Sequence, residues 1–121
     1  MLFRSQRLRD HEIKSCIATN CDEQSLGEFK KKMGFEKYFG EHIYCIANVD
    51  NKAKPDPAVF LHAAERMGVK PKECLVFEDS YWGFMAAKAA GMNCIAVKNP
   101  KNKEFFQEHT HGGIEIGRAH V

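Results

Sequence analysis

Polar residues that could hold a phosphoryl group follow three apolar segments of the chain. Thr19 and Asn20 come directly after the first segment, and Lys54 lies in a polar loop after the second. Two acids, Glu78 and Asp79, follow the third. A hydroxyl and free backbone N–H groups hold phosphoryl oxygens, a lysine neutralises them, and carboxylates hold Mg²⁺. These residue types are therefore the parts of a phosphate site with a divalent metal.

Strands and helices are expected to alternate along the chain, and they position these residues. Short apolar runs predict strands at residues 15–18, 42–47, 74–77 and 94–97. Helical spacing of apolar residues, with capping residues before and glycines after, predicts helices at about residues 22–33, 56–67 and 80–90. This alternation indicates an α/β fold with a parallel sheet and helices on both faces. We expect the strand at 74–77 to be buried on both faces.

The carboxyl ends of parallel strands lie at one edge of a sheet, which is where such folds bind ligands. Each residue also has a simpler interpretation. Thr19 could only cap the next helix, Lys54 could only extend into water, and Glu78 with Asp79 could only be an acidic helix start. The joint order of the three sets favours the phosphate site.

Three motifs resemble those of the haloacid dehalogenase superfamily, in its phosphatase and beta-phosphoglucomutase-like branch. They are Ile17-Ala18-Thr19-Asn20, Lys54-Pro55-Asp56-Pro57, and Phe77-Glu78-Asp79-Ser80 with Gly83. The resemblance covers roughly residues 13–100 in the family's order and spacing. It implies a Rossmann-like three-layer fold and a hydrolase acting on a small phosphorylated metabolite, as a phosphatase or phosphomutase.

The resemblance also implies a role for each matching residue. Thr19 and Lys54 would be catalytic, and together with Asn20 they would bind the phosphoryl group. Asp79, helped by Glu78, would hold the cofactor Mg²⁺. The acidic pair favours the magnesium-dependent phosphohydrolases over the metal-free dehalogenases of the superfamily.

The chain departs from the family at the nucleophile. The family uses two aspartates two positions apart on its first strand, whereas no two aspartates of this chain have that spacing. We therefore interpret residues 1–104 as a truncated core that lacks the usual first, central strand and the cap domain. Residues 105–121 form a tail without an assigned function. Without the central strand, the strands at 15–18 and 74–77 would face a gap.

Two other functions stay open. One is a non-catalytic module that binds phosphate and magnesium without turnover. The other is a homo-oligomer or a complementing chain, in which a partner supplies the central strand. An upstream Asp-x-Asp in the encoding DNA would support the truncated enzyme. Binding of phosphate analogues without hydrolysis would support the non-catalytic module, and a mass above that of a monomer would support the oligomer or complementing chain.

Composition excludes several partners. The formal net charge is +2, and the lysines are dispersed among acids, so nucleic acid is not an expected partner. No apolar run approaches the roughly 20 residues of a membrane span, and the first residues do not resemble a secretory signal. We expect a cytoplasmic protein whose five cysteines, none in a Cys-x-x-Cys pair, are reduced.

Overall fold

The computed structural model describes residues 10–34, 36–97, 99, 101 and 114–116. Its strands are β1 (Ile17–Thr19), β2 (Ile43–Cys45), β3 (Leu75–Glu78), β4 (Asn93–Val97) and β5 (Ile114–Ile116). Its α-helices are α2 (Glu23–Met33), α3 (Glu36–Phe39), α4 (Ala58–Met67) and α5 (Tyr81–Ala89), with 3₁₀ helices at Ile46–Val49 and Pro71–Glu73. Within these described residues, no helix combines the length and the apolar character that a membrane crossing requires.

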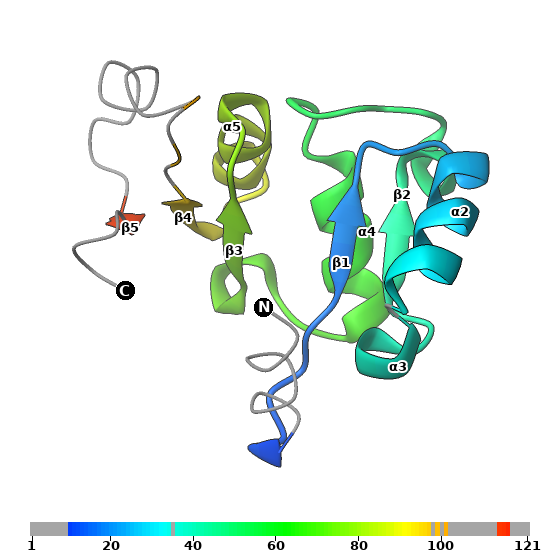
Figure 1. The fold of residues 1–121 in the computed structure, drawn as a ribbon. Helices are drawn as coiled ribbons and strands as arrows, with labels where there is room; N and C mark the ends of the chain where they lie inside the picture. The colour runs from blue at the N-terminus through cyan, green and yellow to red at the C-terminus, as the bar shows by residue number, and fades with distance from the viewer. Residues whose placement is uncertain (1–9, 35, 98, 100, 102–113, 117–121) are drawn as a thin grey trace.

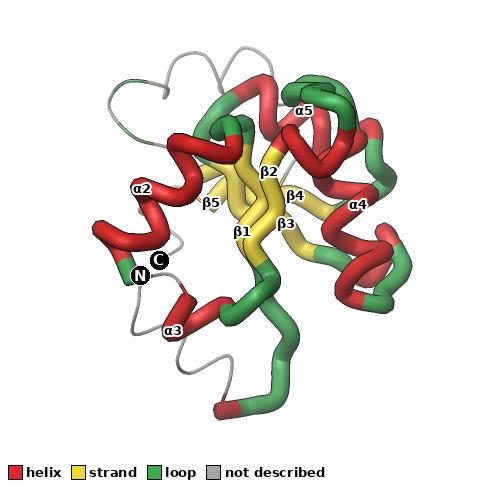
Figure 2. Tube along the Cα trace, turned by 90° about the vertical axis from the view of Figure 1, so that its right-hand side faces the viewer, coloured by secondary structure: helices red, strands yellow, loops and turns green. Residues whose placement is uncertain are grey.

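The elements form three layers, which confirms the Rossmann-like α/β class. All strand pairs are parallel: β1 with β2, β3 with β4, and β4 with β5. Helices α4 and α5 cover one face of the strands, and α2 lies on the other face (Figures 1 and 2). The carboxyl ends of β1 and β3 therefore point to the same edge of the molecule.

Local sequence signals account for the helix boundaries. The Asp22 carboxylate accepts a hydrogen bond of 2.7 Å from the Ser25 N–H at the start of α2. Gly34 ends this helix in the left-handed region, with φ at 64°, where a side chain would be unfavourable. At α5, the Ser80 hydroxyl accepts from the Gly83 N–H at 3.0 Å. These caps satisfy backbone groups that have no partner within the helix.

Two hydrophobic clusters lie on opposite sides of the strands. The larger one packs α4 and α5 against each other, against β3 and β4 and against Ala18 of β1, and its most completely buried large side chains are Val59 and Phe84. The smaller one packs Leu26 of α2 against Ile43 and Cys45 of β2. Because the larger cluster contacts strands of both sheets, helix packing sets the position of the sheets relative to each other.

The parallel strands divide into two sheets between β1 and β3. One sheet has the order β1-β2 and the other β3-β4-β5. The Ile17 N–H donates at 3.1 Å to the carbonyl of His42, the residue before β2, so the backbone groups of the next residue, Ala18, point away from β2. The Asn93 N–H donates to the Cys74 carbonyl, so Leu75 likewise points its backbone groups away from β4. The two open edges face each other at the position where a gap is expected.

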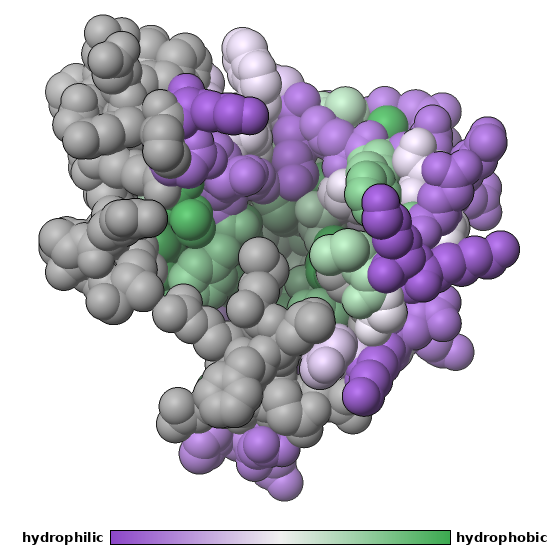
Figure 3. Space-filling model, viewed as in Figure 1, coloured by the Kyte–Doolittle hydropathy of each residue, from purple (hydrophilic) through white to green (hydrophobic). Residues whose placement is uncertain are grey.

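The expected burial of the strand at 74–77 on both faces is wrong. Leu75 is 51% exposed and Phe77 is 60% exposed, while Val76 between them packs against the larger cluster. Figure 3 shows a hydrophobic hollow over β3 and toward β1. In the described part of the chain, α5 covers only the Val76 face of β3. An apolar sequence therefore forms the strand, but no described helix covers its other face.

Two further elements differ from the sequence expectation. The strand expected at 42–47 is shorter, because Ile46 begins a 3₁₀ helix. Residues 114–116, which lie in the predicted tail, form β5 beside β4. The histidines at 109 and 111 lie outside the described residues.

Candidate functional site

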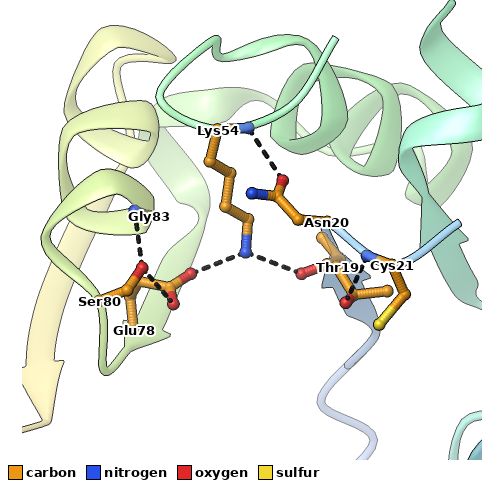
Figure 4. A network of polar contacts seen from close by, with 8 residues as sticks. Thr19, Asn20, Cys21, Lys54, Glu78, Ser80 and Gly83 are labelled. Atoms are coloured by element: carbon orange, nitrogen blue, oxygen red, sulfur yellow. Dashed lines mark hydrogen bonds and ion pairs between the residues drawn. The ribbon is translucent and has the colours of Figure 1, made fainter. Parts of the chain in front are cut away.

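Lys54 joins the carboxyl ends of the two sheets. Its ammonium donates to the Ala18 carbonyl of β1 at 3.1 Å and to Oε2 of Glu78, the last residue of β3, at 2.8 Å (Figure 4). The two side chains are 9% and 11% exposed. The interpretation of Lys54 as a loop lysine in water is therefore wrong. One buried cation lies between strands that share no backbone hydrogen bond.

Two neighbours hold Lys54 in this position. Oδ1 of Asn20 accepts a hydrogen bond of 2.8 Å from the Lys54 backbone N–H, which fixes the loop to the end of β1. The ring of Phe60, a buried residue of α4, lies with its centroid 4.8 Å from the ammonium. An aromatic face at this distance attracts a cation. Asn20 was a predicted phosphate-binding residue, whereas no sequence signal pointed to Phe60 beyond its place in an apolar stripe.

Glu78 is held from two sides. Oε2 forms the ion pair with Lys54, and Oε1 is 3.4 Å from the Ser80 hydroxyl. Its side chain lies directly against Gly83 of α5, in the space that a Cβ at residue 83 would need. The glycine therefore lets the carboxylate lie against the first turn of the helix. Gly83 belonged to the motif recognised in the sequence, and the structure gives its physical reason.

Thr19 lies at the end of β1, next to the Lys54 contact. Its Oγ1 accepts from the Cys21 N–H at 3.2 Å, and the helix cap beyond it is Asp22 (Figure 4). The interpretation of Thr19 as a helix cap is therefore wrong. A hydroxyl that accepts through its oxygen keeps its proton for donation to a second acceptor. The side chain can thus donate to an oxygen of a ligand at this edge.

The acids supply only part of a magnesium site. Asp79 is exposed and follows Glu78 at the same sheet edge, but Glu78 is engaged by Lys54. Among the described residues, no group of three or more His, Cys, Asp or Glu side chains is placed to hold a metal ion. Mg²⁺ takes near-octahedral oxygen ligands, which often include only one or two carboxylates besides water and substrate phosphate. The donors described here do not by themselves make such a set.

A buried cysteine lies beside the ion pair. Burial, with a further contribution from the Glu78 charge, raises the pKa of the Cys94 thiol to about 12. The thiolate is the nucleophilic form of cysteine. Cys94 is therefore a protonated, unreactive thiol at neutral pH, and its proximity to the site was not visible from the sequence.

The structure thus brings together the predicted residues Thr19, Asn20, Lys54 and Glu78, and it places Asp79 at the same strand end. The combination offers a hydroxyl donor and a fixed ammonium at one edge of a parallel sheet. Such a group of donors suits an anionic ligand with several oxygens.

The chain is similar in sequence and fold to known proteins of one hydrolase family. Residues 5–91 match the model of the haloacid dehalogenase-like hydrolase family. The chain is 54% identical over 109 residues to a probable pseudouridine-5'-phosphatase of Drosophila melanogaster, covering 86% of this chain and 47% of that protein. It is 34% identical over 88 residues to a phosphorylated carbohydrates phosphatase of Thermotoga maritima, covering 73% of this chain and 40% of that protein.

A solved structure is also similar. It is a haloacid dehalogenase family hydrolase from Deinococcus radiodurans, crystallised with bound phosphate and sodium, with a TM-score of 0.84 and 25% identity. The match covers 98% of this chain and 54% of that one. The chain thus spans about half the length of each of these three proteins.

Proposed function

Because the chain belongs to the haloacid dehalogenase-like hydrolase family, we propose that it is the phosphoryl-binding part of a phosphohydrolase core. The substrate class is a small phosphorylated metabolite, and the reaction is phosphate hydrolysis or phosphoryl transfer. The observation that carries this proposal is the buried ammonium of Lys54, fixed between the ends of β1 and β3.

The geometry supports phosphoryl binding by this chain's own groups. An ammonium has more N–H donors than the two contacts with Ala18 and Glu78 use. The Thr19 hydroxyl lies at the same strand end and has a proton to donate. The low exposure of Lys54 strengthens its attraction for an anion, because less water screens the charge. Lys54 and Thr19 would therefore bind two oxygens of one phosphoryl group.

The reaction itself needs a nucleophile that we propose is supplied from outside this sequence. Three described groups around this site do not fit the role, because the Glu78 carboxylate is paired with Lys54, the Cys94 thiol is protonated and the Ser80 hydroxyl caps α5. No pair of aspartates has the family's spacing. An Asp-x-Asp on a further strand would complete the core, and the chain alone would be weakly active or inactive.

We propose that Asp79 is the residue of this chain that binds Mg²⁺. Its exposed carboxylate lies at the sheet edge that carries Lys54. Glu78 would contribute mainly by positioning Lys54, with which it pairs. We infer that Mg²⁺ binding by the chain is weak and that completion of the donor set requires further oxygen ligands. Calorimetric titration of the original chain and of Asp79→Ala with MgCl₂ measures how much the Asp79 carboxylate contributes to the Mg²⁺ affinity.

Hydrolysis of p-nitrophenyl phosphate, with and without MgCl₂, tests the proposed need for an external nucleophile. We expect no turnover above background by the chain, and the same result for Asp79→Ala. Magnesium-dependent turnover that is lost in Asp79→Ala would contradict it, because the chain would then have its own nucleophile or obtain one from a second copy.

The open edges of β1 and β3 favour one further candidate, a chain completed by a partner's strand. Backbone groups of Ala18 and Leu75 point into the space between the sheets, and the apolar side chains of Leu75 and Phe77 are exposed beside it. Unpaired strand edges are templates for pairing with another chain. A homo-oligomer or a complementing subunit would satisfy both edges.

Sedimentation velocity over a range of protein concentrations distinguishes an oligomer of this chain from a monomer. A homo-oligomer has a mass that is a multiple of 13.8 kDa, and it dissociates to the monomer when Leu75→Lys places a charge at the open edge. A monomer at all concentrations would exclude self-completion.

A further inference from the structure

A cavity of about 530 Å³ lies at the amino ends of β1 and β2, the opposite end of the strands from Lys54. Its walls come from the segment before β1, from α3 and from the last turn of α4. Apolar side chains of Ile13, Phe39 and Met67 form part of the lining. The volume is within the range of about 300–1,000 Å³ that is usual for small-molecule sites.

The charged side chains that line this cavity are both cations. Lys14 and Arg66 reach it from two separate segments, the His42 imidazole joins them from a third, and no carboxylate lines it in the described part of the chain. The Lys14 ammonium donates to the Met67 carbonyl at 3.1 Å, which holds it beside the end of α4. Basic groups in a last helical turn complement the helix dipole. This interaction with the helix dipole accounts for the positions of Lys14 and Arg66. It accounts neither for the position of His42 nor for the cavity that the three residues line.

A buried tyrosine organises part of this lining. The Tyr44 hydroxyl is 2.9 Å from Nδ1 of His42 and donates to the sulfur of Met67 at 3.8 Å. Tyr44 is 7% exposed, and its ring is in edge contact with His62, with 5.4 Å between the ring centroids. The phenol therefore holds His42 and Met67, two residues of the lining, in place before any ligand arrives, which lowers the entropy cost of binding.

We propose that this cavity binds a small organic anion with a flat apolar body. The acidic group contacts Lys14, His42 and Arg66, and the apolar body packs against Tyr38 and Phe39. Charge-assisted hydrogen bonds to a preformed set of donors provide the specificity for an anion. Because the cavity and Lys54 lie at opposite ends of the strands, this ligand does not compete with phosphate and occupies a second site.

Nuclear magnetic resonance titration of the full 121-residue chain with benzenesulfonate tests the proposal. We expect saturable shifts of the amide signals of Lys14, His42 and Arg66. In Lys14→Gln and Arg66→Gln, the dissociation constant rises by about tenfold or more, the size of effect expected when one charge-assisted contact is lost. Lys72→Gln, at an exposed lysine outside the cavity lining, keeps the original constant.

The neutral analogue benzenesulfonamide separates anion binding from apolar binding. Equal affinity for the two compounds, unchanged affinity in Arg66→Gln, or shifts centred on Lys54 would each overturn the proposal. If a glutamine variant gives no native spectrum, titrations of the original chain at low and high NaCl replace it. Affinity that falls as salt rises supports binding through charge, and affinity independent of salt overturns it.

Discussion

The side chain of Glu78 lies in the space that a Cβ on Gly83 would occupy. This close approach lets Glu78 lie against the start of α5 while its carboxylate pairs with Lys54 at 2.8 Å. A single glycine thus controls where the carboxylate, and through it the cation of the candidate site, can lie.

Replacement of this glycine gives the first prediction. Gly83→Ala displaces Glu78 and lowers the free energy of unfolding by about 1–3 kcal/mol, the usual cost of overpacking. The matched control is Gly27→Ala in α2, where a Cβ meets no atom within 4 Å. That change raises the free energy of unfolding by up to about 1 kcal/mol, because alanine favours a helix. Urea unfolding of both variants measures the difference, and equal effects would contradict the close approach.

The Lys54–Glu78 ion pair gives the second prediction. Lys54→Met leaves the Glu78 carboxylate nearly buried without its cation, which costs about 3 kcal/mol of the free energy of unfolding. The exposed Lys52→Met changes it by less than about 0.5 kcal/mol. Adding Glu78→Gln to Lys54→Met recovers part of the loss, since the uncompensated charge is removed. A double-mutant cycle without coupling between the two positions would show that the pair contributes nothing to stability.

Alkaline pH gives the third prediction, through the buried thiol of Cys94 and the partly buried thiol of Cys16. Burial raises the pKa of Cys94 to about 12 and that of Cys16 to about 11, from the ordinary thiol value of 9.0. The folded chain binds these protons more tightly than the unfolded chain does. Their contribution to stability is therefore complete below about pH 9 and is lost as pH rises toward the folded values.

Urea midpoints measured from pH 8 to about pH 11 test this dependence. The midpoint falls with pH in the original chain and falls less steeply in Cys94→Ala. An identical slope in the variant would mean that Cys94 does not carry the linkage.

The uncovered face of β3 gives the fourth prediction. Phe77 is 60% exposed, so Phe77→Thr changes the free energy of unfolding by less than about 0.5 kcal/mol. Phe84 is 2% exposed in the larger cluster, and Phe84→Ala lowers it by about 3–5 kcal/mol. Thermal unfolding of both variants makes the comparison. Similar losses at the two positions would mean that the Phe77 face is covered in solution.

Local signals were sufficient to predict much of the fold. Asp22 and Gly34 mark the ends of α2, and Ser80 marks the start of α5, because capping chemistry depends on residues near in sequence. The convergence of Thr19, Lys54 and Glu78 could also be predicted, since parallel strands bring their carboxyl ends to one edge. The alternation of strands and helices in the sequence was sufficient to predict this convergence.

Other features depend on contacts between distant residues. The apolar pattern of β3 indicates a strand, but its burial depends on whether another element covers Phe77. The contact of Phe60 with Lys54 arises only when α4 packs beside β1. The basic cavity combines three segments whose proximity has no local signature. These features required the three-dimensional arrangement.

Phosphate titration followed by nuclear magnetic resonance tests the central claim most directly, namely that the carboxyl ends of β1 and β3 form a phosphoryl-binding site around Lys54. We expect inorganic phosphate to shift the amide signals of Thr19, Asn20 and Cys21 in the original chain and in Lys52→Met. In Lys54→Met these shifts disappear while the rest of the spectrum stays native. Phosphate shifts that persist in Lys54→Met, or that occur only away from these residues, would contradict the claim.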